Sequence, residues 1–114
     1  MKSKGNTLLT REQLNELTFK KNLSGEEALR EVKKDGHMLR FVKGQTVEIC
    51  MAAVKSHSGA LVYIKNQTPE MCMAAVKLDG DALKYVKDQM LEICEAAVKE
   101  NPYALEYVEE RFLS

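Results

Sequence analysis

The chain has 114 residues, enough for one domain with its own core, and its 45% hydrophobic and 30% charged content is typical of a soluble globular protein. No apolar run reaches the length of a membrane-spanning helix and residues 1–6 are polar, so we expect a cytoplasmic protein without a membrane partner. The 17 basic and 17 acidic side chains cancel, which leaves no net charge to recruit nucleic acid.

The balanced charge hides a difference between the two halves of the chain. Residues 1–57 carry 11 basic and 7 acidic side chains, whereas residues 58–114 carry 6 and 10. In an elongated molecule this split would steer head-to-tail association or a charged partner. The alternative is drift in composition over a solvated surface, where each exposed charge pair contributes little free energy.

The first 23 residues read as a polar tail followed by a helix near residues 11–21. Thr10 and Gln13 have the spacing of a capping box, in which each side chain bonds the backbone N–H of the other. Leu17 and Phe19 fall in the same columns as residues of the repeat described next. We therefore expect a degenerate half repeat that acts as an N-terminal capping helix.

A 22-residue repeat occupies the rest of the chain. The string Ala-Ala-Val-Lys recurs at 52–55, 74–77 and 96–99. The second and third units agree at 13 of 22 positions, and the third and fourth agree at 10. This periodicity predicts one domain, 24–114, of four units that the N-terminal helix completes. The four units are 24–45, 46–67, 68–89 and 90–111.

Each unit is expected to begin with a helix. In the third unit Thr68 can cap the free N–H groups, Pro69 suits the first turn, and the helix should run to about Leu78. Ser24 and Glu27 have the spacing of a capping box for the first unit.

A second helix should follow after a short break. Gly80 is expected to end the first helix by adopting a left-handed conformation, and Gly36 is expected to do the same in the first unit. Apolar residues then recur at helical spacing over 81–88. Helices this short need packing on neighbours for stability, as in helical repeat proteins.

Two columns of large residues, one leucine and one aromatic, should stack from unit to unit as a continuous core. They are Leu17, Leu39, Leu61, Leu83 and Leu105, and Phe19, Phe41, Tyr63, Tyr85 and Tyr107. The predicted fold is all-α, with tandem two-helix repeats stacked as a short α-solenoid.

The third unit, which reads Thr-Pro-Glu-Met-Cys-Met-Ala-Ala-Val-Lys-Leu-Asp-Gly-Asp-Ala-Leu-Lys-Tyr-Val, resembles the short repeats of a family of unknown function. Those repeats occur in bacterial, phage and giant-virus proteins, and the resemblance extends over residues 24–111. It implies an all-helical fold and brings no activity, cofactor or catalytic residue.

No set of residues indicates a metal site, a cofactor site or catalysis. Cys50, Cys72 and Cys94 share one repeat column, so packed helices should hold them too far apart for a disulfide or a zinc site, and we expect buried core thiols. His37 and His57 lie in different columns without a ligand partner in sequence, which favours solvated turn residues. We therefore expect no enzyme.

The first functional hypothesis is a protein-protein interaction module, because helical repeats present long shallow surfaces. One specific version is a small phage or mobile-element inhibitor of a host protein. The basic N-terminal half is one candidate interaction surface, and it also supports nucleic-acid binding, the least favoured alternative. Its candidate residues are Lys20, Lys21, Arg30, Lys33, Lys34, Arg40 and Lys43.

The C-terminal end is the second candidate interaction surface. No further unit follows 90–111, so Tyr107, Phe112 and Leu113 are expected to form an uncovered apolar cluster. This motivates the second hypothesis, a self-assembling dimeric or head-to-tail structural protein. In the alternative, Phe112 and Leu113 fold back and cover the last helix pair.

Overall fold

The computed structural model describes residues 8–11, 13 and 23–114, and these residues are mostly helical. Within them there is no β-strand, so the all-α prediction is confirmed. None of the helices in this part of the chain has the length and apolar character that a bilayer crossing requires. The helices are α2 (Gly25–Lys34), η2 (Gly36–Phe41), α3 (Val47–Ser56), η3 (Ser58–Tyr63), α4 (Pro69–Leu78), η4 (Gly80–Tyr85), α5 (Leu91–Glu100), η5 (Pro102–Tyr107) and η6 (Glu110–Phe112), where η denotes a 3-10 helix.

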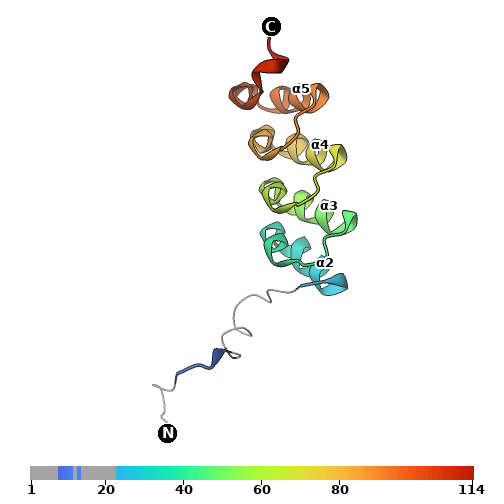
Figure 1. Ribbon diagram of the computed structural model, residues 1–114, viewed down its shortest axis with the longest axis vertical. Coiled ribbons are helices and arrows are strands. Elements are labelled where there is room, and N and C mark those ends of the chain that lie inside the picture. Colours follow the sequence, from blue (N-terminus) through green and yellow to red (C-terminus); the bar gives the residue numbers. More distant parts are fainter. Residues whose placement is uncertain (1–7, 12, 14–22) are drawn as a thin grey trace.

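The helices form four pairs that follow one another along a single direction (Figure 1). We call α2–η2, α3–η3, α4–η4 and α5–η5 pairs 1 to 4. Each α-helix packs on the α-helix of the next pair, and each 3-10 helix packs on the next 3-10 helix. The four α-helices begin 22 residues apart, at Gly25, Val47, Pro69 and Leu91. The result is a two-layer stack with an α-helical side and a 3-10 side.

The helix starts agree only partly with the sequence-based expectations. Thr68 accepts a hydrogen bond from the N–H of Met71 at 3.2 Å, and α4 ends at Leu78 as predicted. Thr10 and Gln13 form the expected reciprocal bonds, at 2.9 and 3.1 Å. The helix predicted over 11–21 lies largely outside the described residues.

The capping box predicted at Ser24 is wrong. The Ser24 side chain accepts no capping bond, because Gly25 follows it with a φ of 59°. A left-handed residue directly after the cap turns the first backbone N–H groups away from the serine hydroxyl.

The second helix of each pair is shorter than predicted. In pair 3 it spans Gly80–Tyr85 and is a 3-10 helix, whereas the sequence pattern indicated 81–88. Its cap is Asp79, which ends α4 in an extended conformation and accepts a bond from the N–H of Asp81 at 3.0 Å. Val86 then donates to the carbonyl of Leu83 and turns extended. A segment of six residues is too short for its apolar spacing to distinguish a 3-10 helix, with 3.0 residues per turn, from an α-helix, with 3.6.

The role predicted for Gly36 and Gly80 is also wrong. Among the described residues only Gly25 has a positive φ, so neither glycine makes a left-handed helix end. A Cβ at Gly36 would instead overlap the carbonyl oxygen of Ala53, and one at Gly80 would overlap that of Ala97. Glycine is needed here because the α-helix of the next pair approaches the backbone closely.

The leucine column forms the centre of the core in the first three pairs. Leu39, Leu61 and Leu83 are fully buried, whereas Leu105 is 52% exposed. The aromatic residues lie at the edge of the core and are half-buried: Phe41, Tyr63, Tyr85 and Tyr107. Leu17 and Phe19 lie outside the described residues. The core therefore extends through all four pairs, and at pair 4 its leucine, Leu105, is exposed to solvent.

Candidate protein-interaction surface

The basic candidate residues do not form a single uniform patch. Lys20 and Lys21 lie outside the described part of the chain, and the other five are exposed on pair 1 and the turn after it: Arg30, Lys33, Lys34, Arg40 and Lys43. Lys34 pairs with Glu31 at 3.9 Å, and the guanidinium of Arg40 stacks over the Phe41 ring at 4.7 Å. The positive charges of Lys34 and Arg40 thus already interact with Glu31 and Phe41 of the same pair.

A shallow groove of about 450 Å³ runs between α2 and α3 beside this basic region. Lys33 and Lys55 line it together with Glu48 and the apolar side chains of Leu29 and Met51. Its rim therefore mixes both charge signs, which does not favour a polyanion.

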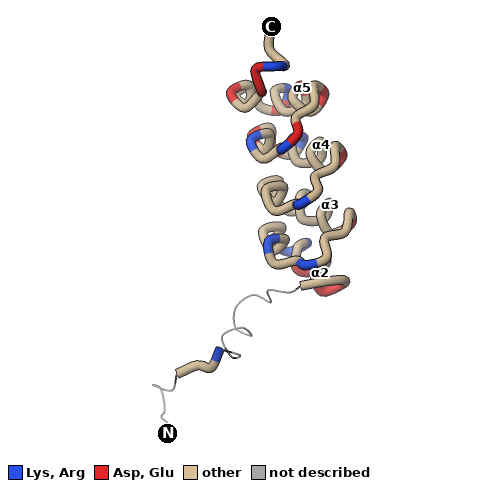
Figure 2. The backbone as a smooth tube through the Cα atoms, viewed as in Figure 1, with Lys and Arg blue, Asp and Glu red and all other residues tan. Residues whose placement is uncertain are grey.

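Acidic residues gather at the opposite end of the stack (Figure 2). The last α-helix and the segment after it carry Glu92, Glu95, Glu100, Glu106, Glu109 and Glu110. The acidic half of the split expected from sequence therefore lies at one end of the stack, whereas residues 25–41 of pair 1 carry four basic and four acidic side chains.

An apolar groove of about 390 Å³ lies at this acidic end. Leu91 and Val98 of α5 form one wall, and Leu105, Val108 and Phe112 form the other. Glu95 and Lys99 supply the charged side chains of its lining.

The groove consists of positions that the preceding pairs bury. Leu105 and Val98 occupy the columns of Leu83 and Val76, which are both fully buried because pair 4 covers them. Val98 is half-buried and Leu105 is 52% exposed, since no fifth pair lies on them in the structure. The exposed surface is therefore a helix-packing face.

The three C-terminal candidate residues have different positions. Phe112 is half-buried in the groove wall beneath the Arg111 guanidinium, 4.2 Å from the ring centroid, and Leu113 is 48% exposed at the groove. Tyr107 is half-buried on η5 and does not line the groove. The chain end thus covers part of pair 4 and leaves the rest open.

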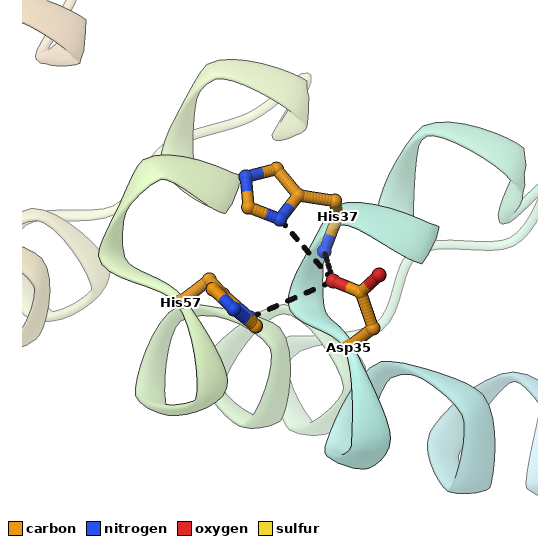
Figure 3. Close-up of side chains that lie close together, drawn as sticks. All are labelled: Asp35, His37 and His57. Atoms are coloured by element: carbon orange, nitrogen blue, oxygen red, sulfur yellow. Dashed lines mark hydrogen bonds and ion pairs between the residues drawn. The ribbon is translucent and has the colours of Figure 1, made fainter.

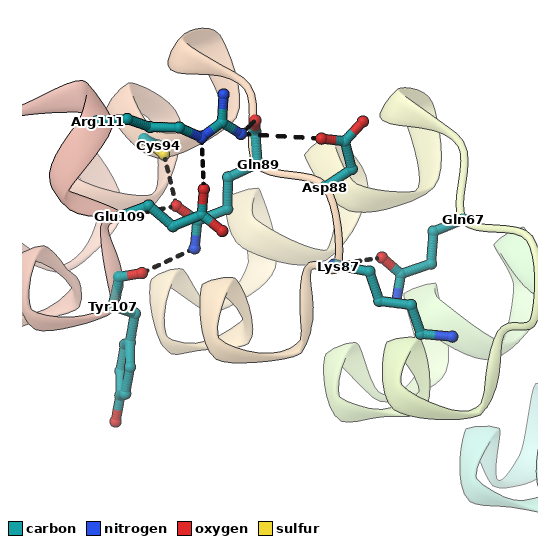
Figure 4. Close-up of polar contacts among 8 residues, drawn as sticks. All are labelled: Gln67, Lys87, Asp88, Gln89, Cys94, Tyr107, Glu109 and Arg111. Carbon is teal, nitrogen blue, oxygen red and sulfur yellow. Dashed lines mark hydrogen bonds and ion pairs between the residues drawn. The ribbon is translucent and has the colours of Figure 1, made fainter.

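Arg111 fixes this end of the chain to the preceding linker. It donates to the carbonyl of Gln89 at 2.7 Å and pairs with Glu109 at 2.7 Å (Figure 4). A second ion pair, to Asp88, is longer at 3.8 Å. The wall of the groove that contains Phe112 is therefore held to the linker before α5.

The sequence analysis gave no role to the glutamine column, although each glutamine, in the linker before a pair, bonds the backbone at the end of that pair. Gln89 donates to the carbonyl of Tyr107 at 2.7 Å and accepts from the N–H of Glu109 at 2.9 Å (Figure 4). Gln45 and Gln67 make the same two bonds to residues 18 and 20 positions ahead. The sequence feature that could have indicated this role is the constant spacing of the three glutamines at the ends of the units.

Each cysteine lies against the glutamine five residues before it. Sγ of Cys94 is 3.4 Å from Oε1 of Gln89, and Cys72 is 3.5 Å from Gln67. All three cysteines are free and buried. Burial raises the pKa of Cys72, and the charge of Asp88 raises it further. The thiols are thus held in the neutral, weakly nucleophilic form.

The two histidines meet in a cluster that the sequence analysis missed (Figure 3). Nδ1 of His37 lies 3.2 Å and Nδ1 of His57 lies 3.6 Å from Oδ1 of Asp35. The ring centroids are 4.7 Å apart. Asp35 and His57 are separated by one 22-residue period, and this spacing was the signal that they are stacked neighbours.

Asp35 also caps η2, since its carboxylate accepts the N–H of His37 at 3.0 Å. That backbone hydrogen bond is the main reason why the pKa of Asp35 is lowered from its ordinary value of 3.8, and both imidazoles add to the effect. The equivalent position between pairs 3 and 4 holds Asp79, Asp81 and Asn101, where Asn101 donates to Asp81 at 2.9 Å. Only the first interface therefore combines a carboxylate with two imidazoles.

Comparison with known proteins gives one match, over the C-terminal part of the chain. No curated protein and no solved structure matches the chain. Residues 68–113 match the model of a family described as a domain of unknown function (DUF4116), a shorter stretch than the 24–111 expected from the sequence.

Proposed function

We propose that the chain is a short α-solenoid of 22-residue repeats that acts as a non-catalytic protein-interaction module. The observation that carries this proposal is the groove beside α5, because it exposes the helix-packing face that every earlier pair buries. Leu105 is the clearest case, at 52% exposure against 0% for Leu83. Exposed apolar faces of this kind are typical of protein-protein contact sites.

The proposed occupant is an amphipathic helix of a partner protein. Inside the stack the equivalent face of pair 3 is covered by α5, so the shape and the apolar stripe of a helix fit the groove. Acidic residues of α5 and η5 lie at this end of the stack (Figure 2), which favours basic side chains beside the stripe of the partner helix. A small phage or mobile-element inhibitor that binds a host protein is one specific form of this proposal.

The test compares three forms of the chain in quantitative affinity purification from the source organism. Leu105→Glu with Leu113→Glu places charges in the groove, and Tyr103→Glu changes a tyrosine that is 83% exposed and does not line it. We expect a protein that the wild type and Tyr103→Glu retain and that the groove variant loses. Circular dichroism establishes that all three forms are folded.

The retained protein is then purified and its direct affinity for the three forms is measured by calorimetry. A basic amphipathic peptide taken from it should compete for the groove. The proposal is contradicted if no protein depends on the groove residues, or if the purified protein binds the groove variant as tightly as the wild type.

Self-assembly is the second candidate, and the acidic C-terminal end of the stack favours it. In a head-to-tail contact the acidic C-terminal end of one copy would meet the N-terminal end of the next, where the basic candidate residues lie. Light scattering over a concentration series tests it: a mass that rises with concentration and falls with salt supports self-assembly, and a constant monomer mass excludes it.

Nucleic-acid binding is the least favoured candidate, since Glu48 lines the groove beside the basic residues of pair 1. A mobility shift with steep salt dependence would support it, and the absence of a shift at low salt would dismiss it.

A further inference from the structure

The chain contains only two histidines, and both lie at the first interface between pairs. His37 is the second residue of η2 and His57 directly follows α3, yet their ring centroids are 4.7 Å apart with Asp35 beside both (Figure 3). One ligand atom from each of the three residues lies within 4.8 Å of the others. Every imidazole of the chain is thus available to a single small ligand.

The distances fit the coordination shell of a transition metal. Two ligands bound tetrahedrally at about 2.0–2.1 Å are separated by about 3.3 Å. The Asp35 oxygen lies 3.2 Å from Nδ1 of His37 and 3.6 Å from Nδ1 of His57, so two edges of such a tetrahedron are nearly formed. Small side-chain rotations would bring the ligand nitrogens of His37 and His57 to the same separation and so complete the third edge.

The backbone around the cluster allows the histidines to become ligands. The N–H of Gly36 donates to Nδ1 of His57 at 3.2 Å and also to Oγ of Ser56 at 3.1 Å. Because Ser56 remains as an acceptor, His57 can turn its Nδ1 lone pair to a metal without leaving that N–H unpaired. The same bond indicates that Nδ1 of His57 is unprotonated, which is the form that binds metals.

We propose that Asp35, His37 and His57 form a binding site for a divalent transition metal of the Zn²⁺ class, shared between pairs 1 and 2. Two imidazoles and one carboxylate suit Zn²⁺, Cu²⁺ or Ni²⁺ and do not suit Mg²⁺ or Ca²⁺, which take oxygen ligands. All three residues are exposed, so water completes the coordination. The metal joins two consecutive pairs and stabilises their contact.

The first experiment titrates Zn²⁺ into the tag-free full-length chain at neutral pH and follows heat and thermal unfolding. We expect one site per chain and an unfolding temperature that rises with Zn²⁺. His57→Gln and Asp35→Asn should each weaken binding at least tenfold. Asp79→Asn, at the column position of Asp35 between pairs 3 and 4, is the matched control and should bind as the wild type does. Equal affinity in the wild type and His57→Gln would overturn the proposal.

Co²⁺ serves as a spectroscopic probe of the ligands. Visible d–d bands without a thiolate charge-transfer band support nitrogen and oxygen ligation, whereas a thiolate band would place the metal on a cysteine and overturn the proposal. The double variant Asp81→His with Asn101→His rebuilds the same three residue types around Asp79. It should raise the Zn²⁺ stoichiometry from one to two, and a stoichiometry of one in the folded variant contradicts the assignment.

Discussion

The side-chain amide of Gln89 makes the same two hydrogen bonds in pair 4 that the backbone N–H and C=O of Leu23 make in pair 1. Leu23 donates to the carbonyl of Phe41 at 3.1 Å and accepts from the N–H of Lys43 at 2.9 Å. In the same way, Gln89 donates to the carbonyl of Tyr107 and accepts from the N–H of Glu109, the two residues on either side of Val108. Leu23 and Gln89 occupy the same repeat column, so in the later pairs an amide side chain takes the place of the backbone N–H and C=O of one residue.

This relationship predicts the effect of removing one amide. Gln89→Leu leaves a carbonyl and an N–H without partners in a site where the side chain is only 6% exposed, so we expect a loss of about 1–3 kcal/mol in the free energy of unfolding. Urea denaturation measures this change in the free energy of unfolding. Lys65→Ala, at an exposed residue, should change the stability by less than about 0.5 kcal/mol. Equal stability of Gln89→Leu and wild type would show that the amide is not a structural link.

The glycines provide a second test. Gly80→Ala forces a methyl group against the carbonyl oxygen of Ala97, which is backbone and cannot move aside, so we expect a destabilisation of about 1–3 kcal/mol. Gly44→Ala meets no atom within 4 Å and should be close to neutral. Thermal unfolding of the two variants distinguishes them. A destabilising Gly44→Ala and a neutral Gly80→Ala would contradict the close approach of α5.

The leucine column predicts a gradient of mutational effects. Leu83→Ala removes a fully buried side chain and should cost about 2–5 kcal/mol. The same change at Leu105, half exposed at the groove, should cost less than half as much. Chemical denaturation of the two variants gives the ratio. A loss at Leu105 as large as that at Leu83 would mean that a second copy or a partner covers the groove in solution.

The buried thiols predict a dependence on pH and on unfolding. The pKa of Cys72 is raised above its ordinary value of 9.0, so its contribution to stability is fully present below that value and is lost as pH rises through the higher folded pKa. A thiol reagent should therefore react slowly with the folded chain and rapidly in urea.

Stability measured from neutral pH to about pH 10 should fall less for Cys72→Ala than for the wild type. Rapid reaction of all three thiols in the folded chain would show that they are accessible, contrary to their burial.

The 22-residue period, the start and end of α4, the buried leucines of the first three pairs and the buried cysteines were all predictable from sequence. The helix start depends on local rules, because Thr68 caps the helix and Pro69 has a fixed φ. The buried leucines and cysteines could be predicted because residues at the same place in successive units have the same surroundings.

Tertiary structure alone decided the features that involve two pairs at once. The need for glycine at positions 36 and 80 and the meeting of Asp35 with His57 depend on how closely one pair lies on the next. A helical pattern read along one unit contains no information on that distance. It is set by packing across the interface, which brings residues about 20 positions apart in sequence into contact.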